Sequence, residues 1–131
     1  MPHPTDRYHA HVYYDSQTRE TALQFHQKLE EMRATGALPN VFMVCAMQDG
    51  NVGPHPKPQF EIHFLANALS TIVPLLKASG LTALVHPLTD DDLADHTTLG
   101  EWIGEPLPLD LSTLDPPGKN QGIARFGKRD F

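Results

Sequence analysis

Two histidines separated by a single residue, His9 and His11, stand near the start of the chain. They lie in a segment, Tyr8–Tyr14, whose aromatic and β-branched residues are typical of a β-strand. Because successive strand side chains point to opposite faces, both imidazoles and the Tyr13 ring share one face. The two histidine Cβ atoms are then roughly 7 Å apart. Imidazoles at that spacing can converge on one metal ion or on one anionic group of a substrate.

Further polar side chains occur on two later segments, 59–64 and 82–87, that also predict strands. The candidate metal ligands on the three segments are His9, His11, His86 and Glu61. Two histidines and a carboxylate on one side of a metal leave positions open for a substrate and dioxygen, as in non-haem Fe(II) oxygenases. Zinc accepts the same ligands. The alternative is a set of exposed or hydrogen-bonded strand histidines, and for His63 alone a solvated strand face is the favoured interpretation.

Six predicted elements position these residues, in the order strand, helix, strand, strand, helix, strand. This order predicts an α+β fold, the ferredoxin-like βαββαβ sandwich, with a four-stranded antiparallel sheet and two helices on one face. In that arrangement the first and third strands lie in the middle, and the fourth pairs with the first. The polar residues of 8–14, 59–64 and 82–87 would therefore lie on adjacent strands, on the face away from the helices.

Three features of these elements are ambiguous in the sequence. The run Val41–Met47 is apolar on both faces, so it is either buried on both sides or half-buried with one face in a subunit contact. Pro74 should kink the second helix unless that helix begins at Ser70. In the fourth strand, either Ala83 and Val85 or their neighbours could face the helices.

The length of 131 residues suits one domain, which we expect to have its core at about 7–87. Residues 88–131 form a C-terminal extension with a short helical candidate at 90–96 and a loosely ordered tail from about 118. We expect this extension to fold across the sheet edge or its open face, or onto a second subunit.

The composition, 40% hydrophobic and 20% charged, is that of a soluble globular protein. No apolar run approaches the ~20 residues of a membrane span, and the first residues lack the features of a signal peptide, so we expect a cytoplasmic protein. The net charge of −6 without a basic block argues against nucleic acid as a partner. The single cysteine, Cys45, excludes an internal disulfide, and an inert buried thiol is its simplest interpretation.

No phosphate-binding glycine loop and no G-x-S-x-G elbow occurs in the chain. His55 lies between two prolines in a loop rich in glycine and proline. Prolines restrict the backbone on both sides of this histidine, so the loop is either a rigid turn alone or a rigid support for a catalytic group.

Several short motifs in one order resemble the DOPA 4,5-dioxygenase family of fungal pigment synthesis and its bacterial relatives. The motifs are His9–Asp15, Gly53–Pro56 followed by Phe60-Glu61, Leu84–Thr89, Asp95–Thr97, Trp102–Gly104 and Pro108–Asp110. The resemblance covers about residues 7–111. It implies a ferredoxin-like domain that usually pairs as a homodimer, and an extradiol dioxygenase that opens a catechol ring with dioxygen at non-haem Fe(II).

The resemblance also implies roles for individual residues. The metal ligands would come from His9, His11, His86 and Glu61, with Fe(II) as the cofactor and zinc as a possible occupant of the purified protein. His55 or His96 would transfer a proton close to the metal, and Tyr13 and Trp102, with Phe42, would form an apolar wall for a small aromatic diol. His63 belongs to none of the matching motifs, so we give it no role.

Two other classes of function remain open on the sequence. One is a monooxygenase on a dimeric ferredoxin-like fold, working with haem or with no cofactor. The other is a non-catalytic dimeric module that binds a small molecule or a metal. Metal analysis of the protein distinguishes them, because only the dioxygenase requires about one iron-type site per chain that depends on His9 and His11.

Overall fold

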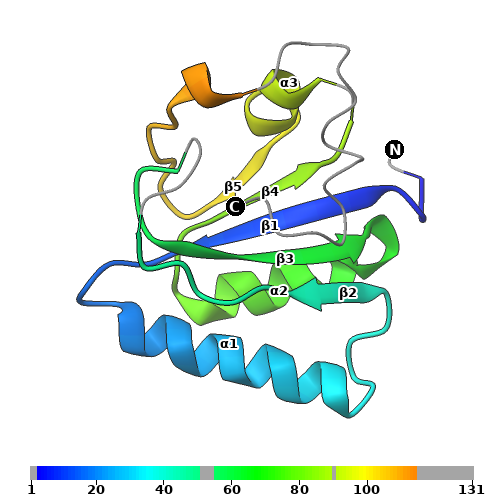
Figure 1. The fold of residues 1–131 in the computed structure, drawn as a ribbon. Coiled ribbons are helices and arrows are strands. Elements are labelled where there is room, and N and C mark those ends of the chain that lie inside the picture. The colour runs from blue at the N-terminus through cyan, green and yellow to red at the C-terminus, as the bar shows by residue number, and fades with distance from the viewer. Residues whose placement is uncertain (1–2, 51–54, 90, 115–131) are drawn as a thin grey trace.

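The computed structural model describes residues 3–50, 55–89 and 91–114 of the chain (Figure 1). Over these residues the fold is α+β. In chain order its elements are β1 (Arg7–Tyr13), α1 (Arg19–Ala34), β2 (Val41–Val44), β3 (Gln59–Leu65), a 3-10 turn (Ala66–Ala68), α2 (Leu69–Ser79), β4 (Ala83–Pro87), α3 (Asp92–His96), β5 (Glu101–Ile103) and a second 3-10 turn (Leu111–Thr113).

All pairs of neighbouring strands are antiparallel, and the sheet order is β2-β3-β1-β4-β5. The expected pairing of the first strand with the third and fourth is confirmed. The expected number of four strands is wrong, because β5, from the C-terminal extension, pairs with the edge of β4. A strand of three residues is too short to show an alternation in the sequence, and its pairing comes from the edge that β4 offers.

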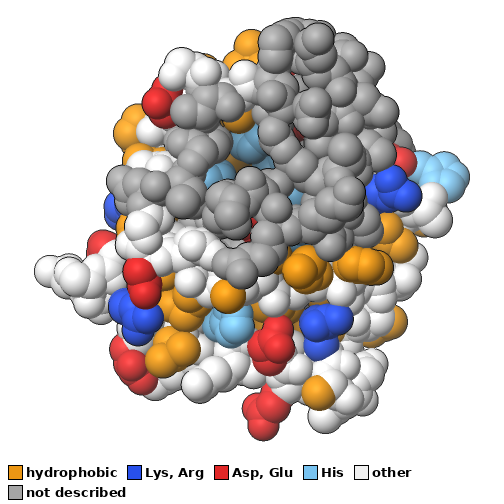
Figure 2. Space-filling view, in the orientation of Figure 1, with side chains coloured by type: hydrophobic (Ala, Val, Ile, Leu, Met, Phe, Trp, Pro, Cys, Tyr) orange, Lys and Arg blue, Asp and Glu red, His pale blue; other side chains and the backbone are white. Residues whose placement is uncertain are grey.

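The helices α1 and α2 cover one face of the sheet (Figure 1), and the apolar core lies between them and that face. The apolar side chains of Ala22, Phe25 and Leu29 on α1 are buried, with Leu29 fully inside, while charged side chains of both signs lie over α1 on the outer surface (Figure 2). In β4, Ala83 and Val85 join this core, which settles the orientation of that strand. The helix α2 continues through Pro74 and ends at Ser79, and Gly80 caps it in a left-handed conformation with a φ of 76°.

The strand β2 is shorter than the predicted run. Val41 and Val44 are buried against the helices, a register irregularity separates Val41 from Met43, and Phe42 is 58% exposed. Of the two predicted arrangements, the half-buried one is therefore found in the single chain: one face of the segment is buried and the other is exposed.

The described part of the C-terminal extension, residues 88–89 and 91–114, lies at the sheet edge and over the open face, as expected. Its strand β5 extends the sheet beyond β4, and α3 stands on the side opposite α1 and α2 (Figure 1). The tail from about residue 118 lies outside the described residues. None of the helices in the described part of the chain is long and apolar enough to cross a membrane.

Candidate metal centre

The side of the sheet away from α1 and α2 is polar but nearly as well buried as the apolar core. Six polar side chains from the three central strands are at most 1% exposed: His9, His11, Gln59, Glu61, His63 and His86. Figure 2 shows histidine atoms in a recess of the upper half of the molecule. Polar groups are rarely buried together unless partners satisfy them, so this cluster requires a chemical explanation.

The strand register brings the cluster together. On β1, His9 lies opposite His63 of β3 and His86 of β4, and His11 lies opposite Glu61. His9, His11 and His86 each offer one nitrogen, and these three atoms all lie within 4.8 Å of one another, which is close enough for a single metal ion. The structure therefore assembles the three predicted nitrogen ligands in one place.

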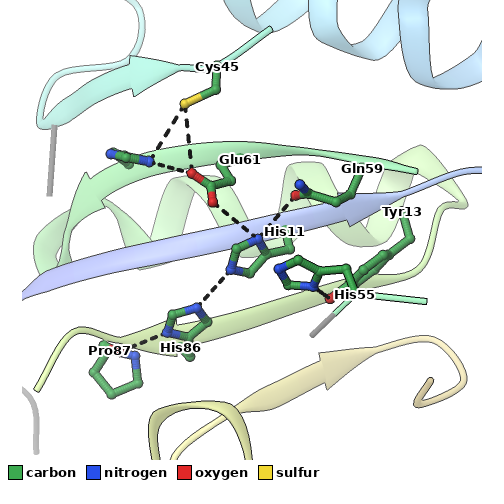
Figure 3. A network of polar contacts seen from close by, with 9 residues as sticks. His11, Tyr13, Cys45, His55, Gln59, Glu61, His86 and Pro87 are labelled. Atoms are coloured by element: carbon green, nitrogen blue, oxygen red, sulfur yellow. Dashed lines mark hydrogen bonds and ion pairs between the residues drawn. The ribbon is translucent and has the colours of Figure 1, made fainter. Parts of the chain in front are cut away.

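Two imidazole nitrogens face each other at the heart of this group, His11 Nε2 and His86 Nε2, 2.9 Å apart (Figure 3). The other nitrogen of each ring has an acceptor. His86 Nδ1 donates to the Pro87 carbonyl at 2.8 Å. His11 Nδ1 lies 3.1 Å from Gln59 Oε1, on the side where the carboxylate of Glu61 also lies at 3.7 Å. When both rings are neutral their protons are therefore on Nδ1, and the two Nε2 lone pairs point at each other.

Such a pair of lone pairs repels unless a proton or a metal cation lies between them. Burial, with the neighbouring imidazoles of His55 and His86, lowers the pKa of His11 well below its ordinary value. Burial, with His96 next in effect, lowers the pKa of His86 in the same way. Both rings are thus deprotonated near neutral pH, which is the state that binds metals. The donor set fits a metal ion held by nitrogen.

The predicted carboxylate ligand has a different position from the one expected. Glu61 Oε2 faces the Nδ1 edge of His11, while Oε1 contacts His63 Nε2 at 3.0 Å. By distance it groups with His9 and His63, and not with His11 and His86. In the neutral tautomer described above, Glu61 would orient the His11 ring, as carboxylates do for metal-bound histidines.

The expected solvated position of His63 is wrong, because this side chain is fully buried. Its ring stacks on that of His9 with 3.8 Å between the ring centres, and Cys45 Sγ lies 3.7 Å from its Nε2. Alternation placed His63 on this face correctly. Its burial depends on the chain beyond β2, which the strand pattern does not reveal.

Both predicted proton-transfer histidines lie against the central rings. His55 has its ring centre 4.2 Å from that of His11, and His96 has its ring centre 4.2 Å from that of His86. Both side chains are buried. Burial, with His96 next, lowers the pKa of His55 to about 3, so His55 is neutral near pH 7.

The predicted aromatic wall is present in part. Tyr13 and Trp102 stack with 5.8 Å between ring centres, and the Tyr13 hydroxyl lies 2.6 Å from His55 Nδ1. Burial raises the pKa of Tyr13 above its ordinary value, so its hydroxyl keeps its proton. Phe42 is not part of this wall, because it lines a separate surface pocket of about 470 Å³ with Arg7 and Leu65.

Three residues of the centre were not predicted as site residues. Gln59 was on the correct face by alternation, and its amide contacts His11. Asp95 accepts hydrogen bonds from the backbone and hydroxyl of Thr89 and so fixes the chain next to His96. Cys45 was expected to be buried, as it is, but nothing in its apolar strand indicated that it lies beside Glu61 and His63.

Fold and centre together define an α+β protein with a buried histidine and carboxylate cluster that can hold a metal ion. The model of the Dopa 4,5-dioxygenase family matches residues 8–113 of the chain. The chain belongs to this family.

Two curated relatives and one solved structure show the extent of the similarity. The chain is 30% identical over 112 residues to the DOPA 4,5-dioxygenase of Amanita muscaria, covering 82% of this chain and 49% of that one. It is 32% identical over 114 residues to an uncharacterized 21.2 kDa protein of Botryotinia fuckeliana, covering 79% and 61%. A crystal structure of a candidate dioxygenase from Nostoc punctiforme matches with a TM-score of 0.72 and 34% identity, over 84% of this chain and 91% of that one.

The chain thus spans about half to three fifths of the length of these two curated relatives. The chain also shares its family and its fold with proteins named as dioxygenases.

Proposed function

We propose that the chain is an extradiol ring-cleaving dioxygenase, which opens a DOPA-like catechol with dioxygen at a non-haem Fe(II) centre. The observation that carries the proposal is the pair of facing nitrogens, His11 Nε2 and His86 Nε2, in a buried site of a dioxygenase family. The pair supports a metal-dependent protein over a haem-using or cofactor-free monooxygenase. Membership of a dioxygenase family favours catalysis over a module that only binds a metal.

In this proposal His9, His11 and His86 hold the metal. Gln59 and Glu61 accept from His11 Nδ1 and keep its Nε2 directed at the centre. When bound, Fe(II) acidifies the two catechol hydroxyls and supplies the redox chemistry for dioxygen. Zinc fits the same donors, so purified protein can contain zinc without being active.

His55 has a defined proton in this arrangement. Tyr13 keeps its phenolic proton and donates it to His55 Nδ1, so neutral His55 carries its own proton on Nε2. This assignment makes the Nε2–H of His55 a hydrogen-bond donor toward a bound substrate, while His96 stands on the other side of His86 as the second candidate for that role. The Tyr13–Trp102 stack would contact the apolar part of the catechol ring.

The test is anaerobic loading of the metal-free protein with Fe(II), followed by a panel of catechols and isotopically labelled dioxygen. A dioxygenase consumes one dioxygen per ring opened and places both labelled atoms in a yellow semialdehyde product. Zinc-loaded protein is the matched control and should give no product. One labelled atom in the product would indicate a monooxygenase, and no product from any catechol with iron bound would favour the binding module.

Two further expectations belong to this proposal. We infer that residues 7–87 form a ferredoxin-like unit, supported by the strand order β2-β3-β1-β4 and two helices on one face. We also propose a homodimer, supported by the family resemblance and by the exposed Phe42 on the edge strand β2. Light scattering of the purified chain, and of Phe42→Ser, measures whether dimers form and whether this edge takes part.

A further inference from the structure

A second group of metal-ligating atoms lies on the other side of Glu61 from His11. Cys45 Sγ is 3.7 Å from His63 Nε2 and 4.0 Å from Glu61 Oε1, and those two atoms are 3.0 Å apart. Figure 3 shows the Cys45 and Glu61 side chains pointing toward each other. The group therefore offers one sulfur, one nitrogen and one oxygen, each from a different side chain. None of these three atoms belongs to the His9, His11 and His86 group.

The spacing of the three atoms is that of a metal site. Zinc binds sulfur at about 2.3 Å and nitrogen or oxygen at about 2.0–2.2 Å in a tetrahedron, which places its ligand atoms roughly 3.3–3.6 Å from one another. The three distances here lie within a few tenths of an ångström of that range, some above and some below. In the metal-free chain the 3.0 Å between Glu61 Oε1 and His63 Nε2 is an ordinary hydrogen bond, whereas 3.7 and 4.0 Å are long for bonds donated by a thiol.

We propose that Cys45, Glu61 and His63 form a second metal site of the zinc type, next to the catalytic centre and distinct from it. A thiolate with an imidazole and a carboxylate selects zinc over hard cations such as magnesium. Three protein ligands leave a fourth position for water.

The three ligands are held in place before any metal binds. Cys45 is 7% exposed, Glu61 1% and His63 0%. The backbone of Cys45 is fixed on both sides: its N–H donates to the Glu61 carbonyl at 2.8 Å, and its carbonyl accepts from His26 Nε2 at 2.8 Å. Preorganised ligands of this kind lose little freedom on binding a metal.

A metal at this site joins the end of β2 to β3 and binds the His63 ring, on which the His9 ring stacks. Its role would be structural and positional, because it fixes His63 and through it the orientation of His9. It also makes one carboxylate common to both sites, since Glu61 presents Oε1 to Cys45 and His63 and Oε2 to His11.

The test is an anaerobic titration of the metal-free full chain with Co²⁺, followed by absorbance. Cobalt bound to a thiolate gives a charge-transfer band in the near ultraviolet that cobalt bound to nitrogen and oxygen lacks. We expect this band in the wild-type chain, its loss in Cys45→Ala, and strongly weakened binding in His63→Phe, which keeps a ring against His9. The matched control is His86→Ala, in which the thiolate band should remain.

Metal counting provides the second measurement. The wild-type chain should bind one equivalent of zinc more than Cys45→Ala, and thermal melts should show that zinc stabilises the wild type more than this variant. Cys45 is small and at the end of a strand, so Cys45→Ala should fold.

The proposal is overturned if no charge-transfer band forms, if the band survives in His63→Phe at unchanged affinity, or if Cys45→Ala binds as much zinc as the wild type. Those outcomes would leave a hydrogen-bonded network in which Glu61 and His63 only orient their neighbours. The result does not depend on catalysis: an inactive protein with an intact thiolate band contradicts the proposed function alone, and an active protein without that band contradicts this inference alone.

Discussion

The two faces of β1 are equally buried and chemically opposite. Ala10 and Val12 are 0% exposed beneath the helices, and His9 and His11 are 1% exposed on the other side of the same strand. Burial alone therefore does not identify a hydrophobic core. The two faces differ in whether removing their side chains from water favours folding or opposes it.

The helix-facing side gains stability, because apolar surface leaves water there. The histidine face costs stability in the metal-free chain, since imidazoles and a carboxylate are removed from water and two nitrogens oppose each other. Sites that break the rules of a stable interior are expected where a protein binds or reacts. We therefore expect substitutions on one face to lower stability, and substitutions on the other to lower metal affinity.

The largest effect should come from His11→Ala. Loss of this nitrogen should reduce metal affinity by more than about 100-fold, the upper end of what loss of a residue that only supports a ligand costs. The measurement is metal content after dialysis, with circular dichroism to verify the fold. Val12→Ala, from the opposite face of the same strand, is the control and should keep its metal. Equal metal loss in both variants would remove the distinction between the faces.

On the helix side, Ile62→Ala should lower the free energy of unfolding by about 2–5 kcal/mol, since the side chain is fully buried in the core. Metal bound per folded chain should not change, although Glu61 and His63 are its neighbours on β3. Urea unfolding and metal analysis of the folded fraction give the two values. A stable variant that loses metal would mean that the faces are coupled through the strand.

A smaller effect is expected from the residue that supports His11. Gln59→Leu removes the amide oxygen from Nδ1 and should weaken metal binding by about 10–100-fold. Gln59→Glu restores an oxygen at this position and should recover part of the affinity. Competition with a chelator measures both. Unchanged affinity in Gln59→Leu would indicate that Glu61 orients the ring by itself.

The smallest effect concerns a titrating group on the helix side. Tyr14 donates to Asp49 at 2.7 Å, and burial together with this carboxylate raises its pKa above 10. An acid whose pKa is raised by folding contributes stability below its unfolded pKa, and that contribution is lost as the pH rises beyond about 10. The free energy of unfolding of the wild type should therefore exceed that of Tyr14→Phe at pH 7. Urea unfolding above pH 10 should show a smaller difference between these two free energies. A constant difference would exclude this titration.

The sequence predicted correctly those features that depend on the alternation of strand side chains between the two faces of the sheet. The faces of β1 and β3, and hence the positions of His9, His11 and Glu61 on one side, followed from a period of two residues. The order of the helices and strands then placed β4 beside β1. Local patterns of this kind are set by residues close in the chain, and they survive folding unchanged.

What depends on distant contacts was not predictable from local pattern. The three-residue strand β5 exists because β4 offers an edge, and His63 is buried because the chain beyond β2 lies against it. The resemblance pointed to His55 and His96, while the chain alone gave no reason for either to meet the central rings. The opposition of His11 to His86 depends on which nitrogen each ring turns inward, which only the structure reveals.

The central position of β1 has a consequence for how the protein is made. His11 meets Gln59 across 48 residues and His86 across 75, so each of these two contacts closes a long loop. Such contacts form slowly, and the centre cannot exist until β4 has left the ribosome and paired with β1. Metal binding can therefore stabilise the chain only at the last stage of folding. In nascent chains that end before β4, the histidines of β1 lack the third ligand and stay exposed.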